Sequence, residues 1–334
     1  MYRKAWLMAA LLIFLMACTP SGATQTPSSS PTANVPAATN SPTKPVEIST
    51  PTSQPSSTAV TPTETPTSIS MPTNTQAAAT NAPATSELGL SVTADHTAPD
   101  QFEQIPDEYI QKAAGLRLMF RGSSIAHNIN MGLDCLDGDF GSRRPNYCSD
   151  FYDLKYDRSN WDFPVRGNPG WIQKVDDFIQ LVNQNADSYD VFIFLVDYAD
   201  GIDNATYPKI SDPENFQTRF VDKIEALQAQ HPDKIIVWTT MSMARTGFDN
   251  ETAFNQMLRD YAIEHNKVLF DLADIESHSP DGTAEFDAQN REILYSGYTD
   301  EAQAGHLNAT GRERVARSLW WFMARLAGWD GEQP

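Results

Sequence analysis

Short, mostly unbroken apolar runs recur in the last two thirds of the chain and predict buried β-strands. Their aliphatic and aromatic residues stand at consecutive positions and do not alternate with polar ones. Runs of this kind suit a parallel sheet that is covered on both faces. The predicted strands are residues 116–120, 190–196, 235–239 and 268–272.

The segments between these runs carry apolar residues at helical spacing. Because strands alternate with helices, the pattern predicts right-handed crossovers and an α/β fold, a three-layer α/β/α sandwich with a mostly parallel sheet. Ligands of such sheets bind beyond the carboxyl ends of the strands. The four apolar stripes are Trp171, Val175, Phe178, Ile179 and Val182; Phe216, Phe220, Ile224 and Leu227; Phe254, Met257, Leu258, Tyr261 and Ala262; and Val315, Leu319, Phe322, Met323 and Leu326.

Residues 132–166 are rich in Gly, Asp and Arg and show no period, so we expect a long loop there that can hold a short second strand. Two of the three cysteines, Cys135 and Cys148, lie in this stretch. We favour a disulfide between them, with free thiols as the alternative. A zinc centre is not expected, because no second Cys pair and no His at suitable spacing accompanies them.

The first eighteen residues have the layout of a secretory signal. A short basic start is followed by thirteen apolar residues, Ala5 to Ala17, and then by Cys18. Thirteen residues are too few to span a bilayer. Residues 15–18, Leu-Met-Ala-Cys, resemble the lipobox of bacterial lipoproteins, which implies a lipid on Cys18 and anchoring to the outer face of a membrane. An ordinary cleaved signal is the alternative.

Composition divides the rest of the chain. Residues 19–100 are dominated by Pro, Thr, Ser and Ala and have too little apolar area to offset chain entropy, so we expect a disordered stalk. Residues 101–334 have ordinary aromatic and aliphatic content and are long enough for one domain. The formal net charge of -19, without a basic cluster, argues against nucleic acid as a partner.

A hydroxyl and an imidazole occupy two positions where α/β proteins often have functional residues. Ser124, in the run Gly122 to Ile125, follows the first predicted strand directly, so its hydroxyl should lie near a helix N-terminus. His306 lies just before the last predicted helix. An imidazole can take the proton of a serine hydroxyl, which is otherwise a poor nucleophile near neutral pH. Taken alone, each residue also fits helix capping or packing.

These two segments resemble the SGNH/GDSL family of serine hydrolases. That family opens with Gly-Asp-Ser-Leu after its first strand and closes with Asp-x-x-His before its last helix. Here Ser124 takes the nucleophile's place, Ser123 stands where the family usually has Asp, and His306 matches the base. The resemblance covers residues 115–327 and implies the SGNH hydrolase fold, with a flavodoxin-like sheet, and serine esterase activity.

The resemblance also implies an oxyanion hole, to which the family contributes a glycine and an asparagine from its two other blocks. Gly170, which precedes a predicted helix, fits the glycine, with Gly167 as the alternative. After the strand that ends at residue 196 no Asn stands in the expected place; Asn128 and Asn204 are weak substitutes. The implied donors are therefore the backbone N–H groups of Ser124 and Gly170.

The acid of the implied triad departs from the family pattern, because Gln303 stands three residues before His306. Asp300 and Glu301 lie just upstream, and we favour Asp300 as the acid. A Ser–His dyad with a carbonyl orienting the ring is the other possibility.

Two further groups of residues admit both functional and structural roles. Trp161 and Trp171 flank the expected cleft and could stack on a sugar ring, but packing in the core is favoured. An acidic group after the last predicted strand resembles a metal cluster, but a solvated or helix-capping role is favoured, and no metal is expected. That group is Asp271, Asp274, Glu276 and His278.

Together these features predict a cell-surface serine esterase that acts on an acyl or acetyl ester, with carbohydrate esters as one class of substrate, and that needs no cofactor. The alternative is a catalytically inactive domain of the same fold that binds glycans, which the missing Asn and the displaced Asp favour. The sequence leaves open the acyl group, the alcohol part of the substrate, the oligomeric state and glycosylation of the stalk.

Overall fold

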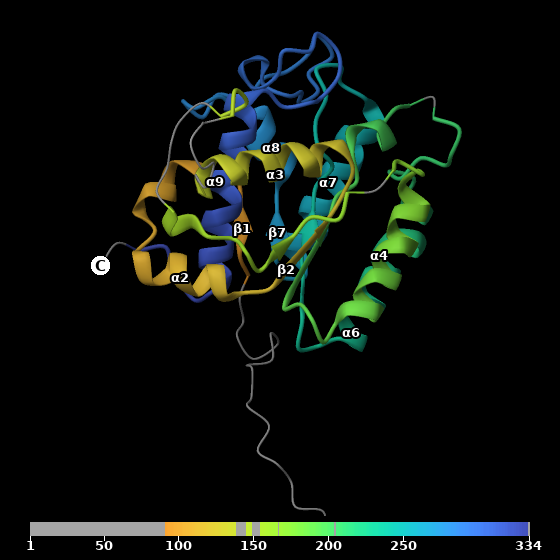
Figure 1. Ribbon diagram of the computed structural model, residues 1–334. Coiled ribbons are helices and arrows are strands. Elements are labelled where there is room, and N and C mark those ends of the chain that lie inside the picture. Colours follow the sequence, from red (N-terminus) through yellow and green to blue (C-terminus); the bar gives the residue numbers. More distant parts are fainter. Residues whose placement is uncertain (1–90, 138–144, 149–153, 166, 204, 333–334) are drawn as a thin grey trace, which may run out of the picture. The chain divides into compact units, whose positions relative to one another are not determined.

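Parallel strands form the centre of the fold (Figure 1). The computed structural model describes residues 91–137, 145–148, 154–165, 167–203 and 205–332. The predicted signal peptide, Cys18 and most of the predicted stalk lie outside the described residues. The described strands are β1 (Thr93–Ala94), β2 (Leu118–Arg121), β3 (Trp161–Asp162), β4 (Val191–Phe194), β5 (Ile235–Ile236), β6 (Trp238–Thr239) and β7 (Leu269–Phe270).

The strands are ordered β3-β2-β4-β5 in one sheet and β1-β7-β6 in the other, and every described pairing between them is parallel. β5 and β6 are the two halves of the predicted strand 235–239. Between them Val237 N donates to Phe192 O of β4 at 2.9 Å, whereas Trp238 N donates to Val268 O beside β7 at 2.9 Å. This one segment therefore links the two sheets.

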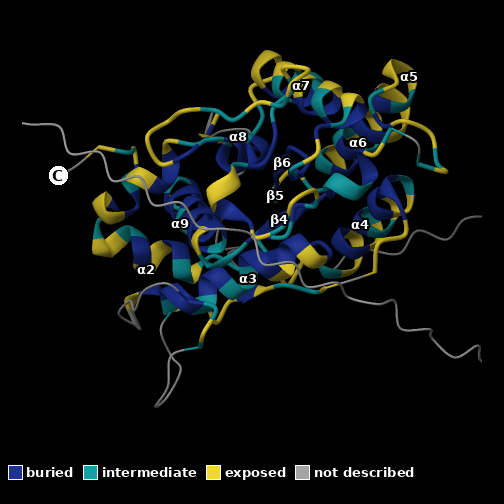
Figure 2. Ribbon diagram, turned by 90° about the horizontal axis from the view of Figure 1, so that it is seen from above, coloured by how far each residue is buried: buried dark blue, intermediate teal, exposed yellow. Residues whose placement is uncertain are grey.

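Alternating residues of β4 show why the sheet needs helices on both faces. Val191 and Ile193 pack into one hydrophobic cluster, whereas Phe192 and Phe194 pack into a second. The first includes the helices Asp107–Gly115, Ser124–Asp137, Leu272–Ser277 and Ala309–Leu326, and the second includes the helices Trp171–Asn185, Asp222–Gln230 and Asp249–Glu264. Figure 2 shows the strands buried between these layers, with the exposed residues on the outer faces of the helices. The chain is thus an α/β protein with parallel sheets and flanking helices, as predicted.

The helices include the four predicted stripes and several elements without a clear sequence signal. The α-helices are α2 (Asp107–Gly115), α3 (Ser124–Asp137), α4 (Trp171–Asn185), α5 (Pro213–Asn215), α6 (Asp222–Gln230), α7 (Asp249–Glu264), α8 (Leu272–Ser277) and α9 (Ala309–Leu326). Shorter or differently wound helices are η1 (Ala98–Gln104), η2 (Leu154–Tyr156), η3 (Tyr198–Asp200), the π-helix η4 (Phe216–Val221) and η5 (Ser296–Tyr298). Among the described residues, no helix is both long and apolar enough to cross a membrane.

Two predicted boundaries need correction. The fold includes residues before 101, because β1 pairs with β7 and η1 packs on α9. A strand of two residues has no detectable hydrophobic period, which explains why the predicted stalk extended too far. The loop expected from residue 132 also begins too early, since α3 continues to Asp137. The short second strand that this stretch was expected to hold is β3.

Cys135, on α3, forms a disulfide with Cys148 in the structure. Trp161 and Trp171, for which the sequence allowed either sugar stacking or core packing, both lie in the core. Trp161 is 5% exposed and packs against Trp320, and Trp171 is fully buried, with its indole N–H donating to Pro208 O at 2.7 Å. Neither ring is therefore available to stack on a sugar.

Candidate active site

Ser124 is the first residue of α3 and follows β2 after a turn of two residues. Its position at the N-terminus of a helix places it near backbone N–H groups that have no partner within the helix. Gly122 makes this turn possible, because a Cβ atom at this position would lie 2.5 Å from Ala126 Cβ and 3.3 Å from Leu195 Cβ. The turn exposes Ser124, whereas Ser123 beside it is buried.

The structure brings His306 to Ser124, although 182 positions separate them. His306 Nε2 lies 3.0 Å from Ser124 Oγ, a hydrogen-bond distance. On the other side of the ring, His306 Nδ1 lies 2.8 Å from Glu301 Oε1, and the backbone N–H of His306 donates to Glu301 Oε2 at 2.9 Å. A carboxylate bound in this way keeps the proton on Nδ1 and leaves the lone pair of Nε2 directed at the serine hydroxyl.

Glu301, not Asp300, therefore occupies the acid's place. Asp300 is exposed, and its carboxylate accepts a hydrogen bond from Asn308 Nδ2 at 3.4 Å. A compact loop explains the change: Thr299 Oγ1 donates to His306 O at 2.7 Å and accepts from Glu301 N at 3.1 Å. The family places its acid three residues before the histidine. Here the acid lies five residues before His306, and the loop brings it back to the imidazole ring.

Electrostatics favours the ionised form of Glu301. Partial burial opposes its ionisation, but the hydrogen bonds from the backbone N–H and the ring of His306 outweigh this effect and lower the pKa of Glu301 below its ordinary value of 4.5. The carboxylate thus remains charged near neutral pH, where it can stabilise an imidazolium on His306.

The neighbours of His306 are held in place by close packing. A Cβ atom at Gly305 would lie 2.3 Å from Met243 O and 2.7 Å from the ring of Tyr198, so only glycine fits. Leu307, which follows His306, is buried, and its N–H donates to Asn128 Oδ1 of α3 at 2.9 Å. Asn128 therefore joins the histidine loop to the helix that carries Ser124, and its amide oxygen is used for this bond.

A buried ion cluster underlies the serine turn. Lys174 Nζ, from α4, lies 2.5 Å from a carboxylate oxygen of both Asp197 and Asp200, and Ser123 donates its hydroxyl proton to Asp197. The three charged side chains are 8%, 3% and 0% exposed. The cluster thus ties the serine turn, the end of β4 and α4 together. A sequence signal existed, because Lys174 stands next to Val175 in an otherwise apolar stripe.

The second aspartate of this cluster titrates abnormally. Burial raises the pKa of Asp200 above its ordinary value, although Lys174 opposes the shift. The neighbouring Tyr207, itself partly buried, has its pKa raised to about 12 by burial and by the charge of Asp200. The phenol therefore stays protonated near neutral pH.

The two glycines considered for the oxyanion hole lie in different surroundings. Gly170 precedes α4 with a φ of 93°, and a Cβ atom there would lie 3.1 Å from the ring of Tyr207. Gly167 lines a small pocket together with Gly122 and Ser123. The oxyanion role of Gly170 stays a prediction, and Asn204 lies outside the described residues.

Comparison with known proteins adds structural likenesses without assigning a family. No family model matches the sequence, and no curated protein matches it. Solved structures similar to this chain include a candidate acylhydrolase from Bacteroides fragilis NCTC 9343, with a TM-score of 0.42, 15% identity and coverage of 67% of this chain and 98% of its own. At such identities and TM-scores, these likenesses carry no argument about activity.

Two more such structures have similar scores. A candidate lipolytic protein of the G-D-S-L family from Desulfitobacterium hafniense DCB-2 has a TM-score of 0.38 and 14% identity, and the match covers 62% of this chain and 99% of that protein. The acetyl xylan esterase AlAXEase has a TM-score of 0.39 and 16% identity, with 61% and 97% covered.

Proposed function

We propose that this protein is a serine ester hydrolase in which Ser124 is the nucleophile, His306 the general base and Glu301 the acid that orients the base. The observation that carries the proposal is the continuous chain of short contacts from Ser124 Oγ through the imidazole to Glu301. The motifs around Ser124 and His306, which resemble those of SGNH/GDSL hydrolases, support the same assignment.

The reaction follows from this geometry. Ser124 Oγ attacks the carbonyl carbon of the ester while its proton passes to His306 Nε2, and the imidazolium then protonates the alcohol as its bond to carbon breaks. Water attacks the resulting acyl-serine with His306 again as base, which releases the carboxylic acid and restores the hydroxyl. Glu301 fixes the tautomer of His306 and stabilises the imidazolium during both steps.

Backbone N–H groups supply the stabilisation of the negatively charged oxygen. The N–H of Ser124, at the start of α3, is one donor. For the second donor we keep the backbone N–H of Gly170, which precedes α4, with Gly167 as the alternative.

The substrate and the location belong to the same proposal. An exported protein anchored through Cys18 would meet esters of envelope or extracellular molecules, so we propose an acyl or acetyl ester, with acylated carbohydrate as the first class to test. The Pro/Thr/Ser-rich stalk would hold the domain away from the membrane. Cys18→Ala should then release the protein from the membrane fraction, and continued membrane association would contradict lipidation at this residue.

The decisive experiment uses residues 19–334 and 4-nitrophenyl acetate. Ser124→Ala and His306→Ala should each lower kcat/KM by at least about 10³-fold, because each removes a group of the reacting unit. The matched control is His127→Ala, which removes an exposed imidazole near Ser124 that is not bonded to it. This variant should keep wild-type turnover.

A second measurement identifies the nucleophile without a substrate. A fluorophosphonate should label wild-type protein at Ser124 and leave Ser124→Ala unlabelled, with thermal unfolding used to show that both proteins are folded. Turnover that is unaffected by Ser124→Ala would refute the proposal. Absence of both turnover and labelling would favour the non-catalytic, glycan-binding alternative.

A further inference from the structure

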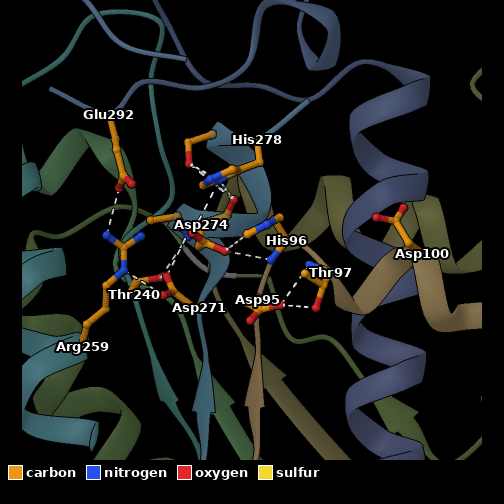
Figure 3. Close-up of polar contacts among 12 residues, drawn as sticks. Asp95, His96, Thr97, Asp100, Thr240, Arg259, Asp271, Asp274, His278 and Glu292 are labelled. Carbon is orange, nitrogen blue, oxygen red and sulfur yellow. Dashed lines mark hydrogen bonds and ion pairs between the residues drawn. The ribbon is translucent and has the colours of Figure 1, made fainter. Parts of the chain in front are cut away.

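A second cluster of histidine and carboxylate side chains lies beyond the carboxyl ends of β1 and β7 (Figure 3). His96 follows β1 by two residues, Asp274 lies in α8 directly after β7, and His278 follows α8. β1 and β7 are parallel neighbours, which brings the three residues to the same edge of the sheet. The sequence alone does not group these residues, because His96 is far from the other two. The pairing of β1 with β7 brings them together.

The three side chains converge closely. His96 Nδ1 lies 2.6 Å from Asp274 Oδ2, and His278 Nδ1 lies 2.8 Å from Asp274 O and 3.5 Å from Asp274 Oδ1. The two imidazole rings are stacked, with centroids 4.0 Å apart and planes 9° from parallel. One potential ligand atom from each residue lies within 4.8 Å of the other two.

We propose that His96, Asp274 and His278 form a binding site for a divalent transition-metal ion of the zinc class. Two imidazoles and one carboxylate form the ligand set of such ions, with bonds of roughly 2.0–2.2 Å. A tetrahedral ion with these bonds separates its ligand atoms by roughly 3.4 Å. His278 Nδ1 already lies 3.5 Å from Asp274 Oδ1, whereas the 2.6 Å between His96 Nδ1 and Asp274 Oδ2 must lengthen and the stacked rings must turn toward the ion. Three protein ligands leave the fourth position to water.

The surroundings of the cluster hold its ligands in place, as metal ligands require. Asp271 caps α8 by accepting from Asp274 N at 3.2 Å, and Asp271 is itself held by Arg259 Nε at 2.7 Å. On the other side, Arg314 Nη2 donates to His96 O at 2.7 Å. The helix-capping role expected from the sequence thus belongs to Asp271, whereas Asp274 and His278 face His96.

An ion can reach these ligands from solvent, because the side chains of His96, Asp274 and His278 are 28%, 18% and 12% exposed. Bound there, it would join the residues after the two-residue edge strand β1 to α8. β1 pairs with β7 over a register of two residues only, and bonds from Leu269 N to Val92 O and from Asp271 N to Ala94 O flank this pairing. We therefore expect the ion to stabilise the edge of the sheet.

Calorimetric titration of residues 19–334 with ZnCl₂, after removal of metal by a chelator and dialysis, tests the site. Wild type should bind one ion at this site. Loss of an outer-shell group at a metal site costs roughly 10- to 100-fold in affinity, so His96→Ala and His278→Ala should weaken binding by at least that factor. His231→Ala, whose exposed ring contacts Asn183, is the matched control and should bind as wild type does.

His306→Ala separates this site from the proposed esterase site, since His306 and Glu301 could also attract zinc. Binding that persists in His306→Ala and is lost in His278→Ala supports the proposal. Absence of binding, loss only in His306→Ala, or unchanged binding in His96→Ala and His278→Ala would overturn it. Thermal unfolding without zinc checks that each variant is folded, and His278→Gln replaces His278→Ala if the latter is not.

Discussion

Two histidine–carboxylate pairs in this protein share one arrangement and differ in what lies beyond the ring. Glu301 accepts from both the backbone N–H and Nδ1 of His306, and Asp274 accepts from both the backbone N–H and Nδ1 of His96. His306 then presents Nε2 to a serine hydroxyl, whereas His96 stacks on the ring of His278. A histidine–carboxylate pair therefore fits proton transfer where a serine hydroxyl faces the ring and fits ion binding where a second imidazole faces it.

Each of the two histidine–carboxylate pairs also lies next to an ion pair between a cation and an aspartate. The buried cluster of Lys174, Asp197 and Asp200 lies under the serine turn, and the pair of Arg259 and Asp271 lies behind Asp274. In both places a cation neutralises an aspartate that lies just beyond a strand; Lys174 is buried and Arg259 is partly buried. Such buried pairs contribute little net stability when intact, but removal of one partner is costly.

The largest expected effect comes from exchanging each carboxylate for its amide. Glu301→Gln should lower esterase kcat/KM by roughly 10²- to 10⁴-fold, because the amide favours the wrong tautomer of His306 and cannot stabilise its imidazolium. Asp274→Asn should keep an esterase kcat/KM within about twofold of the wild-type value, but its affinity for zinc should fall. Ester hydrolysis and zinc titration of both variants check this, and an equal loss of hydrolysis in both would contradict the distinction.

The pH dependence sharpens the same comparison. The pKa of Glu301 is lowered from 4.5, so its carboxylate loses its charge only as the pH falls below that value. The loss of activity in Glu301→Gln should therefore be present throughout about pH 5–8 and should disappear only in more acidic buffer, where wild-type Glu301 also becomes neutral. Activity of Glu301→Gln equal to that of wild type at pH 7 would contradict the assignment of Glu301.

The next effect is on stability. Lys174→Met leaves two buried carboxylates without their cation and should lower the free energy of unfolding by about 3–5 kcal/mol. The matched control is Lys223→Met, which breaks a solvent-exposed pair with Asp176 and should cost less than about 1 kcal/mol. Urea unfolding measures both, and equal losses would mean that the buried cluster does not support the serine turn.

A smaller effect is expected where the serine helix meets the histidine loop. Asn128→Ala removes the acceptor of the buried Leu307 N–H and should cost about 1–3 kcal/mol of stability, with a lower kcat because His306 loses its alignment. Asn128→Asp keeps an acceptor oxygen and should restore most of kcat. Thermal unfolding and steady-state kinetics check this, and a loss of stability with unchanged kcat would assign Asn128 a structural role alone.

The smallest effect tests the assignment of the acid. Asp300→Asn should leave kcat/KM within about twofold of wild type, because Asp300 is exposed and bonds to Asn308 instead of His306. Kinetics with the same acetyl ester decides the point, and a large loss would return the acid's role to Asp300.

Much of the site could be predicted because its main parts lie at ends of strongly patterned elements. Ser124 follows an apolar strand and His306 precedes a long amphipathic helix, so both positions were recognisable in the sequence. Glu301 could not be selected over Asp300, since the loop that carries it is set by hydrogen bonds of Thr299 and His306. The sequence shows that Lys174 is a charge in an apolar stripe, but it does not show which carboxylates neutralise this charge.

The sequence by itself determined the α/β class, the buried strands, the four amphipathic stripes and the two segments that carry the serine and the histidine, because hydrophobic periodicity is a local property. The tertiary structure decided which carboxylate meets His306, that residues 93–94 pair with β7, and that His96 joins Asp274 and His278. These contacts are set by strand order and loop closure over long separations in sequence, and no local pattern encodes the distance between two side chains.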